Sequence, residues 1–232
     1  MNLVLKSNTN IGVLGLGSLS TLFYLETLNK VYNRNFGDYS TCPLLLLNTN
    51  FNEINPFLPD QYKSLEANLL PYLKKMEELN ISHLLIPNIT LHKTWELLNK
   101  KQSFKYTISH PIELTIQSLK RNKQTKIILF ASFFNMSSNC LKIYFLNENI
   151  EVITVSDDNM QFIDHIRKQV YSGITTMIEL EKFNTLVNSY ANDVAVILAC
   201  TELSIAYKGA HQNVYDMAHH QINDTIKKLI TS

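Results

Sequence analysis

The sequence has no excess of charge of either sign, because 21 basic residues stand against 20 acidic ones for a net charge of +1. No basic block stands out, which argues against a nucleic-acid partner. No apolar run approaches the ~20 residues that a membrane-spanning helix needs. Residues 1–6 also lack the apolar core of a signal peptide. We therefore expect a cytoplasmic protein that binds neither nucleic acid nor membrane.

Cysteine is scarce and widely spaced. The three cysteines are Cys42, Cys140 and Cys200. Their odd number and their separation match neither a disulfide framework nor the ligand spacing of a zinc site. A reducing compartment and no bound metal are the simplest expectations.

Apolar runs that end in polar residues alternate with amphipathic segments along all 232 residues. This alternation predicts an α/β protein with parallel sheets flanked by helices. A strand is expected to begin at Ile11, and further strands are expected over 43–47, 83–87, 126–131, 151–155 and the run before Cys200. Helices are expected over 19–32, 61–79, 91–101, 112–121, 136–146, 160–171, 176–190 and 216–230.

The alternating pattern restarts near the middle of the chain. We therefore predict two similar α/β lobes, 1–102 and 103–215, each with a mostly parallel sheet. The terminal helix, within 216–232, is expected to pack back on the first lobe. No linker or low-complexity segment separates the lobes.

One apolar stretch, residues 193–203, ends in Cys200, Thr201 and Glu202. Ligands of open α/β sheets bind at the carboxyl ends of the strands, so this thiol is a candidate catalytic group. A cysteine has a reference pKa of about 8.5, and this pKa must be lowered if the thiol is to act as a base at neutral pH. A helix that opens at Thr201 is expected to lower that pKa.

A second stretch, residues 82–92, has the same pattern but no cysteine, since Asn88 follows Pro87 at the strand tip. A glycine turn near the N-terminus, Gly15-x-Gly17-x-x-Ser20, lacks the third glycine of a dinucleotide fingerprint. We therefore expect no nucleotide cofactor. The free backbone N–H groups of such a turn also suit a carboxylate.

Several motifs together resemble those of the cofactor-independent aspartate/glutamate racemases. Ile197-Leu-Ala-Cys-Thr-Glu-Leu203 matches the second cysteine motif of that family, and Ile86-Pro-Asn-Ile-Thr-Leu-His92 is similar to its Pro-Cys-Asn-Thr-Ala-His segment. Weaker likenesses are the glycine turn with Thr21-x-x-Phe-Tyr24, the Asn48-Thr-Asn-Phe51 loop, and Leu129-Phe-Ala-Ser-Phe-Phe-Asn-Met136.

The resemblance implies two pseudo-symmetric lobes with the active site between them, and a homodimer. It implies two cysteines on opposite faces of the substrate α-carbon, with no pyridoxal phosphate or metal. One thiolate removes the α-proton, and the other thiol protonates the opposite face. The expected substrate is an acidic or small amino acid or a related carboxylate.

Carried over residue by residue, the resemblance gives Cys200 the acid/base role and puts Asn88 where the first family cysteine stands. An amide has no proton that titrates near neutral pH, so symmetric two-thiol chemistry is in doubt. Ile89 replaces the family asparagine. The predicted substrate-binding residues include Thr90 and Thr201 for the α-carboxylate, and Asn48 and Asn50 for the distal end of the substrate. Ser132, which aligns with a family threonine, Ile89, and Glu202, for the amino group or its own helix cap, complete the set.

Three functions remain open at this point. The first is an amino-acid racemase that exchanges the α-proton through Cys200. The second is a single-cysteine decarboxylase or isomerase, similar to the arylmalonate decarboxylases, because decarboxylation needs an acid but no base. The third is a binding protein that has lost catalysis.

Overall fold

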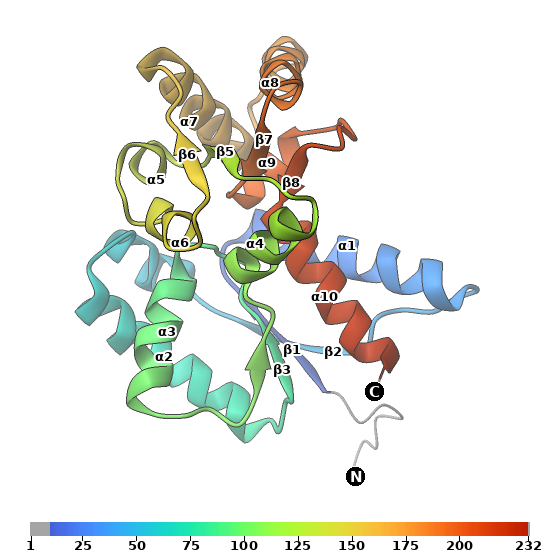
Figure 1. Ribbon diagram of the computed structural model, residues 1–232. Helices are drawn as coiled ribbons and strands as arrows, with labels where there is room; N and C mark the ends of the chain where they lie inside the picture. The colour runs from blue at the N-terminus through green and yellow to red at the C-terminus, as the bar shows by residue number, and fades with distance from the viewer. Residues whose placement is uncertain (1–9, 232) are drawn as a thin grey trace. The chain divides into compact units, whose positions relative to one another are not determined.

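The computed structural model describes residues 10–231 and divides the chain into two compact units. One unit ends at His110 and resumes at Gln221, and the other runs from Pro111 to His220. The division therefore lies after residue 110, where the sequence pattern placed it after residue 102. Each unit is built on its own parallel sheet (Figure 1).

The first unit contains a four-stranded parallel sheet in the order β2-β1-β3-β4. Its strands are β1 (Ile11–Gly15), β2 (Leu44–Asn48), β3 (His83–Leu85) and β4 (Thr107–Ile108). Its helices are α1 (Ser18–Phe36), the 3₁₀ turns η1 (Phe51–Glu53) and η2 (Asn55–Phe57), α2 (Tyr62–Glu78), α3 (Leu91–Lys101) and most of α10 (Met217–Thr231).

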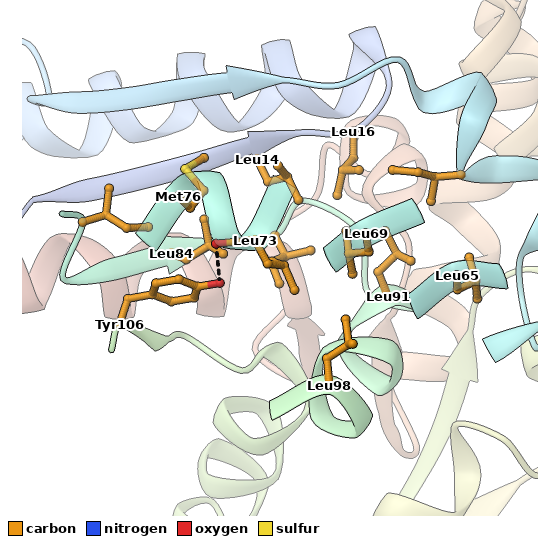
Figure 2. Packing of buried hydrophobic residues seen from close by; sticks show 13 residues of the cluster. Leu14, Leu16, Leu65, Leu69, Leu73, Met76, Leu84, Leu91, Leu98 and Tyr106 are labelled. Atoms are coloured by element: carbon orange, nitrogen blue, oxygen red, sulfur yellow. Dashed lines mark hydrogen bonds between the residues drawn. The ribbon is translucent and has the colours of Figure 1, made fainter. Parts of the chain in front are cut away.

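The core of the first unit lies between this sheet and α2. Leucines spaced four residues apart, Leu65, Leu69 and Leu73, give the helix one apolar face, and all three are fully buried. They pack in one cluster with Leu14 of β1 and Leu84 of β3 (Figure 2). The dashed line in Figure 2 marks a hydrogen bond from the Tyr106 hydroxyl to the Leu73 carbonyl, 3.3 Å long.

The second unit repeats the topology of the first, with a parallel sheet in the order β6-β5-β7-β8. Its strands are β5 (Lys126–Phe130), β6 (Glu151–Ile153), β7 (Ala195–Leu198) and β8 (Val214–Asp216). Its helices are α4 (Pro111–Arg121), α5 (Phe133–Ser137), α6 (Lys142–Leu146), α7 (Asp157–Ser172), α8 (Met177–Ala191) and α9 (Thr201–Ala206). The predicted α/β class, with a parallel sheet in each half, is confirmed.

One local prediction is wrong in the second unit, and one short strand is not predicted from the sequence. The helix expected over 136–146 is two short helices, because the chain turns extended at Ser138, whose hydroxyl accepts a hydrogen bond from the Cys140 N–H. Ser156 caps α7 by accepting the Asn159 N–H. Strand β8 was not expected, since three residues form too short a run to show a period.

Within residues 10–231, no helix is long and apolar enough to cross a membrane.

Candidate active site

Cys200 lies immediately beyond β7, a strand whose four residues are all buried. The Ala199 N–H still bonds the Phe130 carbonyl, which continues the pairing with β5, and Cys200 then caps α9 in an extended conformation. Its carbonyl accepts the N–H groups of Leu203 and Ser204 at 3.0 and 3.1 Å. The thiol is therefore held at a defined strand end rather than on a loose loop.

The thiol donates a hydrogen bond to Glu202 Oε2, with 2.7 Å between Sγ and oxygen. Burial raises the pKa of Cys200 well above its ordinary value, and the Glu202 carboxylate raises it further. The positive charge of Arg167 and the Glu202 backbone N–H oppose this shift. The expected lowering of the Cys200 pKa by a helix N-terminus is wrong, because α9 has only six residues and burial dominates.

Arg167 and Asp164 complete this cluster, and neither was found from the sequence. Arg167 Nε donates to Asp164 Oδ1 at 2.8 Å, one turn apart on α7. Helix α7 packs on α9, and the guanidinium interacts electrostatically with both Cys200 and Glu202. An acid–base pair at this helical spacing is common on solvated helix faces, so the pattern alone does not distinguish Asp164 and Arg167 as site residues.

The neighbouring strand tips of the same sheet bring further polar groups to this edge. Ser132 follows β5 and caps α5, and its hydroxyl accepts the Asn135 N–H at 3.4 Å. Thr201, the first residue of α9, directly follows Cys200 and is buried, with 3% of its surface exposed. Asp216 ends β8 and accepts the Ser204 hydroxyl at 2.9 Å. Burial raises the Asp216 pKa. The structure thus gathers Ser132, Cys200, Thr201 and Glu202 at the carboxyl ends of adjacent strands.

The first unit has its own set of strand-tip residues. Asn48 ends β2 beside Gly15, where a Cβ would lie 2.2 Å from Asn48 Oδ1 and 3.0 Å from its Cα. Only glycine fits this close approach. The Asn50 amide donates to Glu53 Oε1 at 2.9 Å on an exposed turn. Thr49 instead ties the loop down, since its hydroxyl donates to the Gly15 carbonyl at 2.7 Å.

Asn88 follows β3 and caps α3 through its side chain. Its Oδ1 accepts the Leu91 N–H at 3.1 Å, and its carbonyl oxygen is 2.9 Å from His92 Nδ1. Ile89 is 6% exposed and packs into the interior. Thr90 directly precedes α3. The structure therefore brings Asn88, Ile89 and Thr90 to the end of β3. There the side-chain oxygen of Asn88 accepts a hydrogen bond from the first turn of α3.

His92 links this strand end to α10 through a buried network. The Asn88 carbonyl can only accept, so Nδ1 carries the proton and Nε2 accepts from the Gln221 amide at 3.1 Å. Gln221 also donates to the Ser109 carbonyl at 2.9 Å and accepts the Tyr24 hydroxyl at 2.7 Å. Burial lowers the His92 pKa to about 3. Helix α10 therefore contacts α1, which carries Tyr24, and the two helices lie at an angle to each other (Figure 1).

The other two cysteines lie away from these strand tips. Cys42 precedes β2 and is buried, and its burial raises its pKa to about 12. Cys140 is exposed in the turn between α5 and α6, rather than within a helix as the pattern suggested. Among residues 10–231, no group of three or more His, Cys, Asp or Glu side chains is placed to hold a metal ion.

A scan against protein-family models and a search of curated proteins gave no match to the sequence. Solved structures do match. The chain shares the fold of the aspartate and glutamate racemases, in which it aligns along nearly its whole length.

The matches include an aspartate racemase homologue from Pyrococcus horikoshii, with a TM-score of 0.80 and 19% identity over 97% of this chain and 100% of that one. Aspartate racemase from Picrophilus torridus matches with a TM-score of 0.72 and 18% identity over 96% and 94% of the two chains. Glutamate racemase from Campylobacter jejuni matches with a TM-score of 0.60 and 18% identity over 95% and 85%. These likenesses establish the fold.

Proposed function

We propose that the protein is a racemase-like isomerase, independent of pyridoxal phosphate, that exchanges the α-proton of an acidic or small amino acid. Cys200 is the acid/base. The observation that supports this most directly is the thiol at the tip of β7 hydrogen-bonded to Glu202, within a fold shared with amino-acid racemases.

The thiol–carboxylate pair suggests how the proton moves. Cys200 passes its proton to Glu202 Oε2, and the thiolate then takes the α-proton. The α-C–H bond breaks, an S–H bond forms, and the electron pair delocalises into the substrate carboxylate. If the thiol proton exchanges with water before the steps reverse on the same face, the α-carbon receives a solvent-derived proton without inversion. Thr201 and Ser132, at adjacent strand ends, are the proposed donors to the substrate carboxylate.

Inversion needs a proton on the opposite face, which the family resemblance assigns to position 88. Asn88 has no titratable proton, so water must deliver it there. Exchange on the Cys200 face should therefore be faster than racemisation. At the strand ends of the first unit, the proposed site residues remain Asn88, Ile89, Thr90, Asn48 and Asn50.

The test is α-proton exchange in D₂O, followed by NMR over a panel of acidic and small amino acids. We expect exchange by the wild-type protein and its loss in Cys200→Ala. Cys42→Ala is the matched control and should keep the activity, because that thiol lies before its strand rather than at the tip. Absence of exchange with every amino acid, or equal rates for Cys200→Ala and wild type, would overturn the proposal.

A decarboxylase is the second candidate, and the resting state of Cys200 favours it. The raised pKa keeps the thiol protonated at neutral pH, as a proton donor requires. In that reaction the bond from the α-carbon to the leaving CO₂ breaks, the carbon keeps the electron pair, and Cys200 protonates it. Release of CO₂ from substituted malonates, without exchange of any amino-acid α-proton, would select this function over the first.

We also infer a homodimer in a reducing cytoplasm. The dimer follows from the family resemblance, and the compartment from three free cysteines.

A further inference from the structure

Arg167 has donor capacity that the protein itself does not use. Its Nε–H bonds Asp164 Oδ1, and no other hydrogen bond or ion pair engages the guanidinium within residues 10–231. The side chain is 25% exposed. A guanidinium has five N–H donors in a planar fork, so four remain for another partner.

Asp164 holds the guanidinium in a fixed orientation. Burial alone would raise the Asp164 pKa, but hydrogen bonds from Lys168 and Arg167 outweigh it and keep the pKa below its ordinary value. Asp164 Oδ1 also accepts the Phe133 N–H at 3.2 Å, and Lys168 lies 2.7 Å from Oδ2. One carboxylate thus faces two cations, which leaves a surplus positive charge on this part of α7.

The positive charge of Arg167 acts on Cys200 and Glu202, but within residues 10–231 neither group forms an ion pair with it. Arg167 attracts both Cys200 and Glu202, yet no ion pair joins Arg167 to Glu202 in the described part of the chain. Glu202 instead accepts the Cys200 proton. A partly buried cation with free donors beside a reactive thiol is the arrangement expected for an anion-binding residue.

We infer that Arg167 is a substrate-binding residue that holds the side-chain carboxylate of an acidic substrate, and so sets the specificity. The inference rests on the proposed function of Cys200. The substrate's α-carboxylate is bonded directly to the α-carbon, which must contact Cys200 Sγ. Thr201 adjoins Cys200 in the chain, so it is the proposed donor to the α-carboxylate. Arg167 lies on the adjacent helix α7 and not next to Cys200 in the chain. We therefore assign it to the side-chain carboxylate of the substrate.

Binding tests this inference independently of turnover. Calorimetry with succinate and glutarate, against the monocarboxylate butyrate, measures the contribution of the second carboxylate in a Cys200→Ser background. We expect Arg167→Gln to weaken dicarboxylate binding about 10- to 100-fold, the range for hydrogen bonds to a charged group. Butyrate binding should change little.

Lys168→Gln is the matched control, since it removes the next positive charge on α7 and an equal contact with Asp164. It should leave dicarboxylate binding within about threefold of the parent. Should Arg167→Gln fail to fold, Arg167→Lys takes its place, because it keeps the charge and loses the two-pronged fork. It should still weaken dicarboxylate binding more than butyrate binding.

Turnover gives a second readout. If Arg167 binds the distal carboxylate, Arg167→Gln should raise KM for aspartate or glutamate and lower the preference for them over asparagine or glutamine. Equal losses for acids and amides, or unchanged succinate binding, would overturn the inference. Arg167-dependent succinate binding without any α-proton exchange would uphold it while refuting the proposed isomerase.

Discussion

Cys200 is a thiol whose proton is held by a neighbouring carboxylate. Burial and Glu202 both raise its pKa, while Arg167 lowers it. At neutral pH the resting group is therefore an acid, and base action requires prior transfer of its proton to Glu202. In the proposed function, this contact between Cys200 and Glu202 therefore determines whether the thiol can also act as a base.

Replacing Glu202 with glutamine should shift the alkylation of Cys200 to lower pH. The substitution removes the negative charge that disfavours the thiolate, while Arg167 still favours it. The pH profile of iodoacetamide labelling measures the shift. A Cys140→Ser background is needed because Cys140 is exposed. An unchanged profile, or one displaced to higher pH, would show that Glu202 does not control the thiol.

Asn88 is the residue whose replacement should change the stereochemical outcome. Asn88→Cys supplies a titratable group at the position that the family resemblance assigns to the second acid/base. We expect the ratio of inversion to α-proton exchange to rise at least tenfold, measured by chiral chromatography beside deuterium incorporation. The variant also loses the cap on the Leu91 N–H, at a cost of about 1 kcal/mol in unfolding free energy.

Asn88→Ala controls for that lost cap, because it also removes the side-chain acceptor but adds no acid/base group. Alanine should destabilise the fold about as much as cysteine, and it should leave the inversion ratio at the wild-type value. If alanine and cysteine changed the ratio equally, position 88 would act through loop geometry and not through proton transfer.

At the scale of elements, the sequence predicted best where one local rule decides the outcome. The α3 helix was predicted with its observed bounds, Leu91–Lys101. The β7 strand and its terminal cysteine also follow from an apolar run that meets polar residues. Such features depend on neighbours within a few residues.

The elements that sequence could not predict depend on distant packing. Arg167 meets Cys200 only because α7 packs on α9, and no local pattern contains that contact. The split of the helix expected over 136–146 turned on one serine–backbone bond, which competes with helical pairing. The role of Asn88 as a cap was likewise hidden behind its alignment with a cysteine.

Helix α10 should depend strongly on Gln221, which bonds α1, α3 and the loop after β4 at once. Gln221→Leu removes the acceptor of the Tyr24 hydroxyl and the donor to both His92 Nε2 and the Ser109 carbonyl, all of them buried. We expect a loss of roughly 3 kcal/mol in unfolding free energy, measured by urea denaturation. Asn223→Leu, on an exposed position of the same helix, should change it by less than about 0.5 kcal/mol. Similar losses for both would show that the network adds little.

At the scale of the whole molecule, buried neutral histidines should make stability fall in mild acid. Burial and Lys228 lower the His83 pKa from 6.5 to about 4, with Asp224 opposing, and burial lowers that of His92 to about 3. Below pH 6.5 the unfolded chain therefore binds protons that the fold excludes. The stability is full above pH 6.5 and is lost as the pH falls toward 4.

Urea denaturation at pH 7 and pH 4.5 should show this loss, with His83 alone contributing roughly 3 kcal/mol over its full window. The lowered pKa values of Asp164 and Asp224 act only below about 3.8, whereas the raised pKa of Asp216 acts above it with the opposite sign. The comparison with a His83 variant is therefore needed to isolate the histidine. His83→Asn should flatten the slope, because it removes the titrating imidazole. A slope that His83→Asn does not alter would contradict the assignment.

The predicted homodimer has a candidate surface on β2, the edge strand of the first sheet. Leu45 and Leu46 on that strand are 37% and 43% exposed, and an apolar edge strand is prone to pair with another chain. Leu46→Lys should therefore weaken self-association by tenfold or more, measured by sedimentation equilibrium over a concentration series. Leu146→Lys on α6 removes a leucine of similar exposure, 46%, from the other unit, and should leave the association constant unchanged. A dimer that resists Leu46→Lys would have its interface elsewhere, and a wild-type monomer at all concentrations would refute the prediction of a dimer.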